Sequence, residues 1–63
     1  MSYRQARVKA GLSIAEAAKR INVTRATIWL WETGKGNPLL DNLKKMAEVY
    51  GCTVADLVRE ESA

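Results

Sequence analysis

The sequence contains no histidine and no phenylalanine, and it has a single cysteine and a single proline among its 63 residues. A lone Cys52 cannot close an internal disulfide, and without histidine it lacks a companion for a zinc site. A disulfide scaffold and a zinc module are therefore both excluded. Cys52 lies in the apolar run GCTVADL, which favours a small buried hydrophobe over a reactive thiol. An unpaired cysteine without a recognisable signal peptide fits a reducing cytoplasm.

Long apolar runs are missing too. No stretch approaches the roughly 18 residues of a membrane span, and the basic residues do not line one long helix face. The sequence offers no histidine to act as a catalytic base and no glycine-rich loop that could bind a phosphate group. The carboxylates outside the C-terminal segment are spread over three predicted helices and form no close pair: Glu16, Glu32, Asp41 and Glu48. We therefore expect neither an enzyme nor a membrane protein, and no cofactor or metal.

The charge of the chain is unevenly distributed. Nine basic and three acidic residues lie in positions 1–45, whereas one basic and four acidic residues follow. This asymmetry favours an N-terminal surface that meets a polyanion such as nucleic acid, although an ordinary solvated surface explains the charges equally well. The length predicts one domain, residues 1–63, which buries about 60% of its unfolded surface.

Helix-starting residues are easy to recognise along the chain. A serine or threonine is followed three residues later by a polar partner in three places: Ser2 with Gln5, Ser13 with Glu16, and Thr53 with Asp56. Thr24 is a fourth N-cap, and a glycine or a turn follows each of the first four predicted helices. We expect helices over residues 4–9, 14–21, 25–33, 39–50 and 54–59. No alternating pattern indicates a strand, so the predicted fold is an all-α, compact five-helix bundle.

Apolar residues at helical spacing predict the core. They are Ala17, Ala18 and Ile21 in the second helix, Leu40, Leu43, Met46, Ala47 and Tyr50 in the fourth, and Val54, Leu57 and Val58 in the fifth.

The second and third predicted helices together form a helix-turn-helix pattern. Small alanines in the second helix allow a neighbouring helix to approach closely. Asn22 suits a turn that needs a left-handed residue, and Val23, Ile28 and Trp31 supply apolar anchors for the third helix. The ordered set predicts a helix-turn-helix.

The chain resembles the lambdoid-phage repressor and Cro type of DNA-binding domain, which is widespread in bacterial regulators. The resemblance rests on GLSIAEAAKRINVT, TIWLWETGKGNP, LDNLKKMAEVYG and TVADL. It implies a bundle of four or five helices that binds operator DNA as a symmetric dimer, with the third helix in the major groove. A bacterial or phage-encoded regulator associated with the nucleoid is the corresponding expectation.

Three positions depart from that family's pattern. Ile14 stands where the family commonly has a glutamine that touches a phosphate. Gly36 follows Lys35 where another basic residue is frequent, and Leu39 replaces a helix-capping serine.

The third helix has two faces. Residues spaced at 100° place Thr27, Ile28 and Trp31 on one side, and Ile28 and Trp31 match the family's buried positions. The opposite side spans about 140° and holds Arg25, Ala26, Trp29 and Leu30.

We assign hypothetical roles to this second side. Arg25 donates to guanine O6 and N7, the commonest specific base contact. Ala26 and Leu30 contact thymine methyl groups, and Trp29 lies against a sugar–phosphate edge, where its indole N–H reaches a phosphate.

Phosphate contacts are expected from helix N-termini and from positions matched to the family. The candidates are Ser13, Thr24, Thr27, Thr33, Lys35 and Asn37. Plain capping or solvation is the alternative explanation for each of them. The resemblance also implies a partly buried, structural ion pair between Arg7 and Glu32.

The expected partner is a palindromic double-stranded operator bound by a homodimer. The candidate interface comprises the loop around Pro38 together with Leu39, Val54, Leu57 and Val58, although a missing C-terminal domain is another source of two-fold contacts. One rival function is an antitoxin that binds both DNA and a toxin protein through exposed Trp29, Leu30, Leu39 and Ile14. The other rival is a protein-interaction module that has lost DNA binding.

Overall fold

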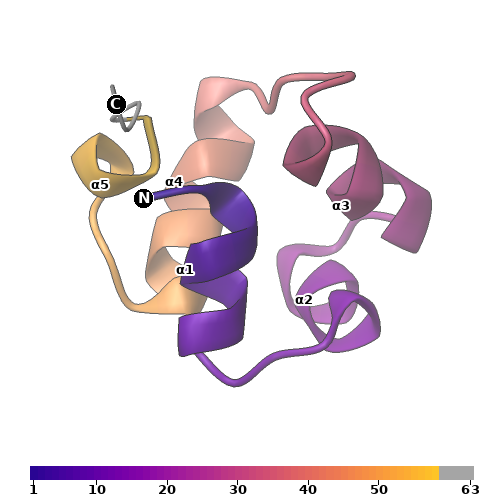
Figure 1. The fold of residues 1–63 in the computed structure, drawn as a ribbon, viewed down its shortest axis with the longest axis horizontal. Coiled ribbons are helices and arrows are strands. Elements are labelled where there is room, and N and C mark those ends of the chain that lie inside the picture. Colours follow the sequence, from indigo (N-terminus) through magenta and orange to yellow (C-terminus); the bar gives the residue numbers. More distant parts are fainter. Residues whose placement is uncertain (59–63) are drawn as a thin grey trace.

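Five helices joined by short loops make up the described part of the chain, residues 1–58 of a computed structural model. They are α1 (Tyr3–Lys9), α2 (Ile14–Ile21), α3 (Arg25–Glu32), α4 (Leu40–Tyr50) and α5 (Val54–Val58). No strand occurs among these residues, so the predicted all-α, five-helix fold is confirmed. Figure 1 shows α2 and α3 on one side of the molecule and α1, α4 and α5 on the other, with the α3–α4 loop crossing between the two groups.

Three of the helices differ from their predicted bounds by one residue at one end. The first helix begins at Tyr3, and Thr33 is the C-cap of α3 rather than its last helical residue. Leu39 is the N-cap of α4 and makes no side-chain capping hydrogen bond. The predicted end of the last helix at Arg59 lies outside the described residues.

Local hydrogen bonds start the helices where the sequence predicts. At α2, Ser13 Oγ accepts from the Glu16 N–H at 3.1 Å, and the Ser13 N–H donates to Glu16 Oε1 at 3.0 Å. This reciprocal pair satisfies donors that a helix N-terminus otherwise leaves open. The same arrangement joins Ser2 with Gln5 before α1 and Thr53 with Asp56 before α5.

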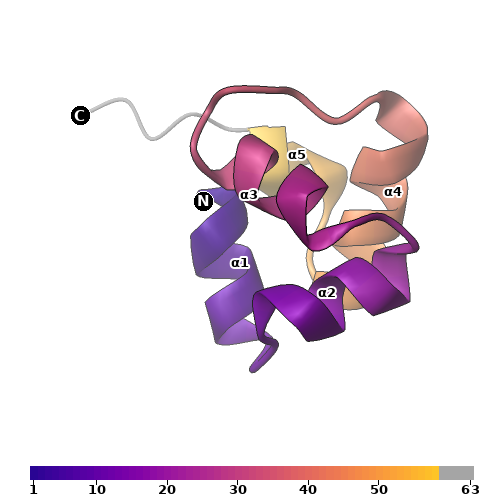
Figure 2. The same ribbon diagram turned by 90° about the vertical axis from the view of Figure 1, so that its right-hand side faces the viewer.

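A left-handed residue makes the turn between α2 and α3. Asn22 has φ 68° and ψ 48°, as predicted. The N–H groups of Asn22 and Val23 both donate to the carbonyl of Ala18, at 2.8 and 2.9 Å. The chain therefore leaves α2 sharply, and α3 packs beside α2 (Figure 2).

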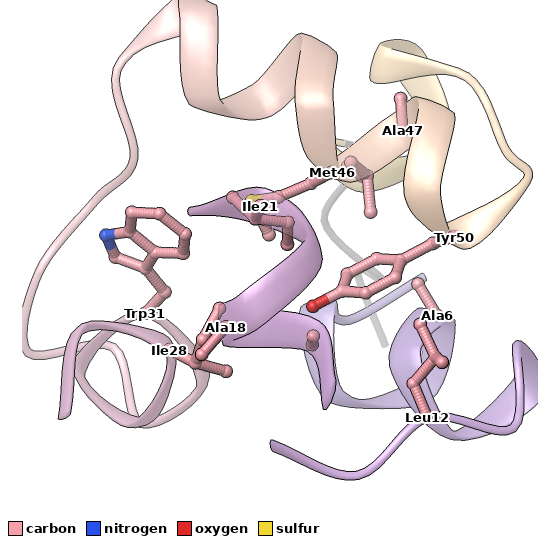
Figure 3. Close-up of a cluster of buried hydrophobic side chains, with 11 residues drawn as sticks. Ala6, Leu12, Ala18, Ile21, Ile28, Trp31, Met46, Ala47 and Tyr50 are labelled. Carbon is pink, nitrogen blue, oxygen red and sulfur yellow. The ribbon is translucent and has the colours of Figure 1, made fainter. Parts of the chain in front are cut away.

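The core lies where α1, α2, α3 and α4 meet, with α5 adding one side chain. Figure 3 shows Ile28 and Trp31 of α3 beside Ala18 and Ile21 of α2, with the Tyr50 ring reaching in from α4. Its buried residues are Ala6, Leu12, Ala17, Ala18, Ile21, Ile28, Trp31, Met46, Ala47, Tyr50 and Leu57.

Two predicted core residues are wrong. Leu40 is 58% exposed because the buried residues of α4 all lie in the second half of that helix, whereas Leu40 is in its first turn. Val58 is also exposed, because the inward side of the described part of α5 is formed by Leu57 and partly by Val54. Leu43, also predicted, is only partly buried against the core.

None of the described helices is long and apolar enough to cross a membrane.

Candidate nucleic-acid interface

Helix α3 buries one side and exposes the other. Ile28 and Trp31 are 1% and 7% exposed, whereas Trp29 and Leu30 are 48% and 39% exposed. Arg25 and Ala26 are exposed as well. We call Arg25, Ala26, Trp29 and Leu30 the outward face of α3. A short helix with apolar groups on both sides has one side for the core and one that is left for a partner.

Threonines hold the N-terminus of α3. Thr24 Oγ1 accepts from the Thr27 N–H at 3.2 Å and lies 2.8 Å from the Thr27 hydroxyl. Two hydroxyls that share one hydrogen bond use only one of their two O–H donors, so the other can point outward. The pair thus caps the helix and also retains a donor for an anion at the same end.

The chain after α3 turns back over the helix. Gly34 has φ 77°, and the N–H groups of Lys35 and Gly36 both donate to the Leu30 carbonyl, at 3.0 and 3.2 Å. This reversal places Lys35 Nζ 5.3 Å from the centroid of the Trp29 ring. A cation over an indole is attracted to its face, so Lys35 adds positive charge directly beside the outward face.

Thr33 uses its donor inside the helix. Its hydroxyl donates to the Trp29 carbonyl at 2.9 Å, with the Leu30 carbonyl at 3.3 Å. A threonine has one O–H, and a phosphate oxygen accepts only. The side chain of Thr33 therefore closes the C-terminus of α3 in this conformation.

The N-terminus of α2 carries a carboxylate. Hydrogen bonds from the backbone and side chain of Ser13 lower the pKa of Glu16, which is fully exposed. Because the Ser13 N–H is engaged by Glu16 and the Ser13 Oγ accepts from the Glu16 N–H, the serine's own O–H is the donor that remains for an anion.

Ile14, in the first turn of α2, is partly buried and packs against the core. Its expected place on an exposed protein-binding surface is therefore wrong.

Arg7 and Glu32 connect α1 with α3. Arg7 Nε and Nη2 donate to the two carboxylate oxygens of Glu32 at 2.7 and 3.1 Å, and Arg7 Nη1 donates to the Leu12 carbonyl at 2.8 Å. Both side chains are buried. The hydrogen bond to Glu32, strengthened by its charge, raises the pKa of Arg7 against the opposing effect of burial. The fork-shaped contact fixes the angle of α3 at its C-terminal end.

The expected dimer interface is only partly available on the surface. Leu57 is buried in the core and is therefore wrong as a surface contact, and Val54 is partly buried. Pro38 itself is buried, but its neighbours Asn37 and Leu39 in the same loop are exposed. Leu39 and Val58 are exposed. Leu57 and Val54 are not free for a second subunit because α5 packs its apolar side against the core of its own chain.

Cys52 is partly buried and packs against the core. Burial raises the pKa of its thiol, and the charge of Asp56 acts in the same direction. A raised pKa disfavours the thiolate, which agrees with a packing role.

The contact between Lys35 and Trp29 was not predicted. Its signal in the sequence was the glycine at position 34, because a left-handed residue after a helix turns the chain back over the last turn. The carbonyl of Leu12 as a partner of Arg7 was also missed, and no local pattern identifies it.

The helix-turn-helix family HTH_3 matches residues 4–57. The chain belongs to this family of DNA-binding domains. An uncharacterized HTH-type transcriptional regulator of Archaeoglobus fulgidus is 41% identical to it over 54 residues, covering 86% of this chain and 77% of that protein. No solved structure gives a significant match.

Two further relatives of this helix-turn-helix domain are longer proteins. The cryptic phage CTXphi transcriptional repressor RstR of Vibrio cholerae is 35% identical over 57 residues, and the chain spans 51% of its length. The HTH-type transcriptional activator BcrR of Enterococcus faecalis is 32% identical over 57 residues, and the chain spans 28% of it. In both cases 90% of this chain is covered. These names are those of regulators, and the antitoxin alternative finds no support among them.

Proposed function

We propose that this helix-turn-helix domain regulates transcription by placing the outward face of α3 in the major groove of an operator. The observation that carries the proposal is the division of α3, which buries Ile28 and Trp31 and leaves a cationic and apolar face exposed. A helix fits the width of the major groove, where base edges can be distinguished.

Arg25 is the proposed base-specific donor. It occupies the first turn of α3, and the first turn of a recognition helix is the part that reaches base edges. Its guanidinium matches the O6 and N7 acceptors of guanine, whereas Ala26 and Leu30 offer only apolar groups. Trp29, which has the Lys35 ammonium over its ring, borders the sugar–phosphate backbone in this proposal.

Phosphates are contacted from both ends of α3 in this proposal. The Thr24 and Thr27 hydroxyls lie at its N-terminus, and exposed Lys35 and Asn37 lie in the loop after it. Ser13 adds its O–H from the start of α2. Thr33 is left out, because its hydroxyl already donates within the helix.

Two copies on a palindromic operator are the proposed assembly, with exposed Leu39 and Val58 as the candidate contacts between them. The proposed location is the cytoplasm, at the nucleoid. A repressor and an activator both occur among the relatives, and repression, by occupying the operator, is the simplest outcome of binding alone.

The test of the proposal is the binding of mutated operators. A duplex is first selected from a random-sequence pool with the parent protein, and Kd is then measured by fluorescence anisotropy for each base-pair change. Arg25→Ala is expected to remove the preference for guanine at one position of the operator. The lost discrimination between guanine and the other bases should amount to about 1–3 kcal/mol. Arg4→Ala, which removes an exposed guanidinium from α1, should keep the parent's preference.

Equal weakening of every sequence by Arg25→Ala would reassign this residue to a phosphate contact. A parent protein that selects no duplex at moderate salt would contradict DNA binding altogether and favour a protein-interaction module.

A further inference from the structure

The outward face of α3 is unusual in what its side chains can recognise. Arg25 and the indole of Trp29 only donate hydrogen bonds, and Ala26 and Leu30 neither donate nor accept. Around the helix, Arg25 forms one edge of the face and Trp29, Ala26 and Leu30 fill the rest. Apart from Arg25 and the indole N–H of Trp29, the side chains of this face present only apolar surface to a DNA groove.

Apolar surface in the major groove has one specific target. Each base pair presents donors and acceptors there, but only a C5-methyl group is apolar. Thymine carries this methyl group, and 5-methylcytosine carries the same group at the same ring position. The two bases differ at C4, where thymine has an acceptor and cytosine a donor. Ala26 and Leu30 have no atom that senses this difference.

We infer that Ala26 and Leu30 read C5-methyl groups, so that the domain accepts 5-methylcytosine in place of thymine at the bases these side chains meet. This inference rests on the proposed function and names the base chemistry that the same face selects. It makes cytosine methylation within an operator a change that strengthens binding, whereas removal of the thymine methyl weakens it.

The structure holds Leu30 ready for such a contact. Its carbonyl is fixed by two N–H donors from the loop, and the backbone of Gly36 lies so close that a Cβ there would stand 3.7 Å from Leu30 Cβ. The loop therefore supports one side of Leu30 and leaves 39% of the residue exposed. The Lys35 ammonium lies over the neighbouring Trp29 ring, 5.3 Å from its centroid. A backbone that is already fixed at Leu30 presents this residue at a defined position, and such preorganisation lowers the entropic cost of binding.

The expected size of the effect follows from the burial of one methyl group. Such a group is worth about a fourfold change in Kd when it moves from water into an apolar contact. This is large enough to measure and small compared with the loss of a bidentate arginine contact.

The experiment uses a duplex selected from a random-sequence pool by the parent protein. Deoxyuridine replaces one thymidine at a time, and in a second series each T·A pair becomes C·G or 5-methyl-C·G. We expect uracil to weaken binding about fourfold at one or two positions of each half-site. At those positions 5-methylcytosine should bind more tightly than cytosine by a similar factor. Deoxyuridine in the flanks is the control for changes in the duplex itself.

Protein variants assign the effect to the side chains. Leu30→Ala should reduce the uracil penalty at one position, whereas Leu40→Ala, which truncates an exposed leucine at the start of α4, should keep it. Ala26→Gly removes the other methyl contact and serves as the second variant if Leu30→Ala melts early. Thermal melting accompanies each measurement.

Failure of this inference is distinct from failure of the proposed function. A parent protein that selects no duplex overturns both. Tight and selective binding with unchanged affinity for uracil, or for 5-methylcytosine against cytosine, overturns methyl reading alone. A uracil penalty that persists in full in both Leu30→Ala and Ala26→Gly also overturns it, because the effect then belongs to the DNA.

Discussion

At the scale of single residues, the buried hydroxyl of Tyr50 lowers the stability of the folded domain because it lacks a hydrogen-bond partner among the described residues. The residue is 7% exposed, its ring crosses the core, and its hydroxyl has no hydrogen-bond partner among the described residues (Figure 3). Burial raises the pKa of Tyr50 to about 12, and the negative charge of Glu32 acts in the same direction, against Arg7. A buried hydroxyl without a partner costs about 1–3 kcal/mol relative to a hydrogen-bonded one.

We expect Tyr50→Phe to stabilise the domain by about 1 kcal/mol, because the ring remains and the unpaired hydroxyl is lost. Thermal melting should show a rise of about 4–8 °C. The parent should also lose stability between about pH 10, the ordinary pKa of tyrosine, and about pH 12, its folded value. The sign follows because the folded state keeps the proton that the unfolded state releases.

This alkaline loss should be smaller in Tyr50→Phe. Tyr3→Phe, which deletes the hydroxyl of a partly buried tyrosine in α1, is the matched control and should retain the loss. A lower melting temperature for Tyr50→Phe would mean that the hydroxyl is hydrogen-bonded in solution.

At the scale of helices, Arg7 and Glu32 hold α1, the loop before α2 and α3 together. The Arg7 guanidinium donates three hydrogen bonds, two to the Glu32 carboxylate and one to the Leu12 carbonyl. The pair sits at the end of α3 opposite to Thr24, so the helix is fixed by a cap at one end and a charged contact at the other. This arrangement sets the direction in which the outward face points.

Glu32→Ala is expected to destabilise the domain by about 3 kcal/mol, because Arg7 then remains buried without its counter-charge. At about 4–8 °C per kcal/mol for a domain of this size, the melting temperature should fall by at least about 12 °C. Glu48→Ala removes the same charge from an exposed site on α4 and should melt close to the parent. Equal melting of Glu32→Ala and Glu48→Ala would show that the pair is solvated.

Helix starts could be predicted from the sequence, whereas the burial of individual apolar residues was less reliable. A cap needs a residue and a partner three positions away, so Ser13 with Glu16 was recognisable. Leu40 shares the helical stripe of Met46 and Ala47 but lies beyond the part of α4 that neighbours cover. Periodicity defines the side of a helix and not how far along it the neighbours extend.

At the scale of the whole molecule, positive charge lies on both helices of the helix-turn-helix and in the loop after them. Lys19 and Arg20 are exposed in the last turn of α2, Arg25 begins α3, and Lys35 lies over Trp29. Figures 1 and 2 show these two helices side by side. Arg25 belongs to the outward face of α3, and Lys35 lies beside it over Trp29. Positive side chains of this kind are the ones that contact phosphates along a groove.

Binding to the selected duplex should weaken steeply with salt. The plot of log K against log salt concentration has a slope of about −0.9 for each phosphate neutralised. Lys35→Ala should make this slope shallower by about 1 while leaving base preference intact. Lys9→Ala, at an exposed position of α1, should preserve the slope. An affinity of the parent that is independent of salt would contradict an interface built on phosphates.

The amino-acid sequence alone determined the features that depend on neighbours in the chain: the helix starts at Ser2, Ser13 and Thr24, and the left-handed turn at Asn22. These are set by hydrogen bonds and backbone conformations within about four residues. Only the tertiary structure decided which of the predicted apolar residues stay exposed, such as Leu40 and Val58, and where Lys35 meets Trp29. The reason is physical, because burial depends on the position of distant helices, and no local pattern carries that information.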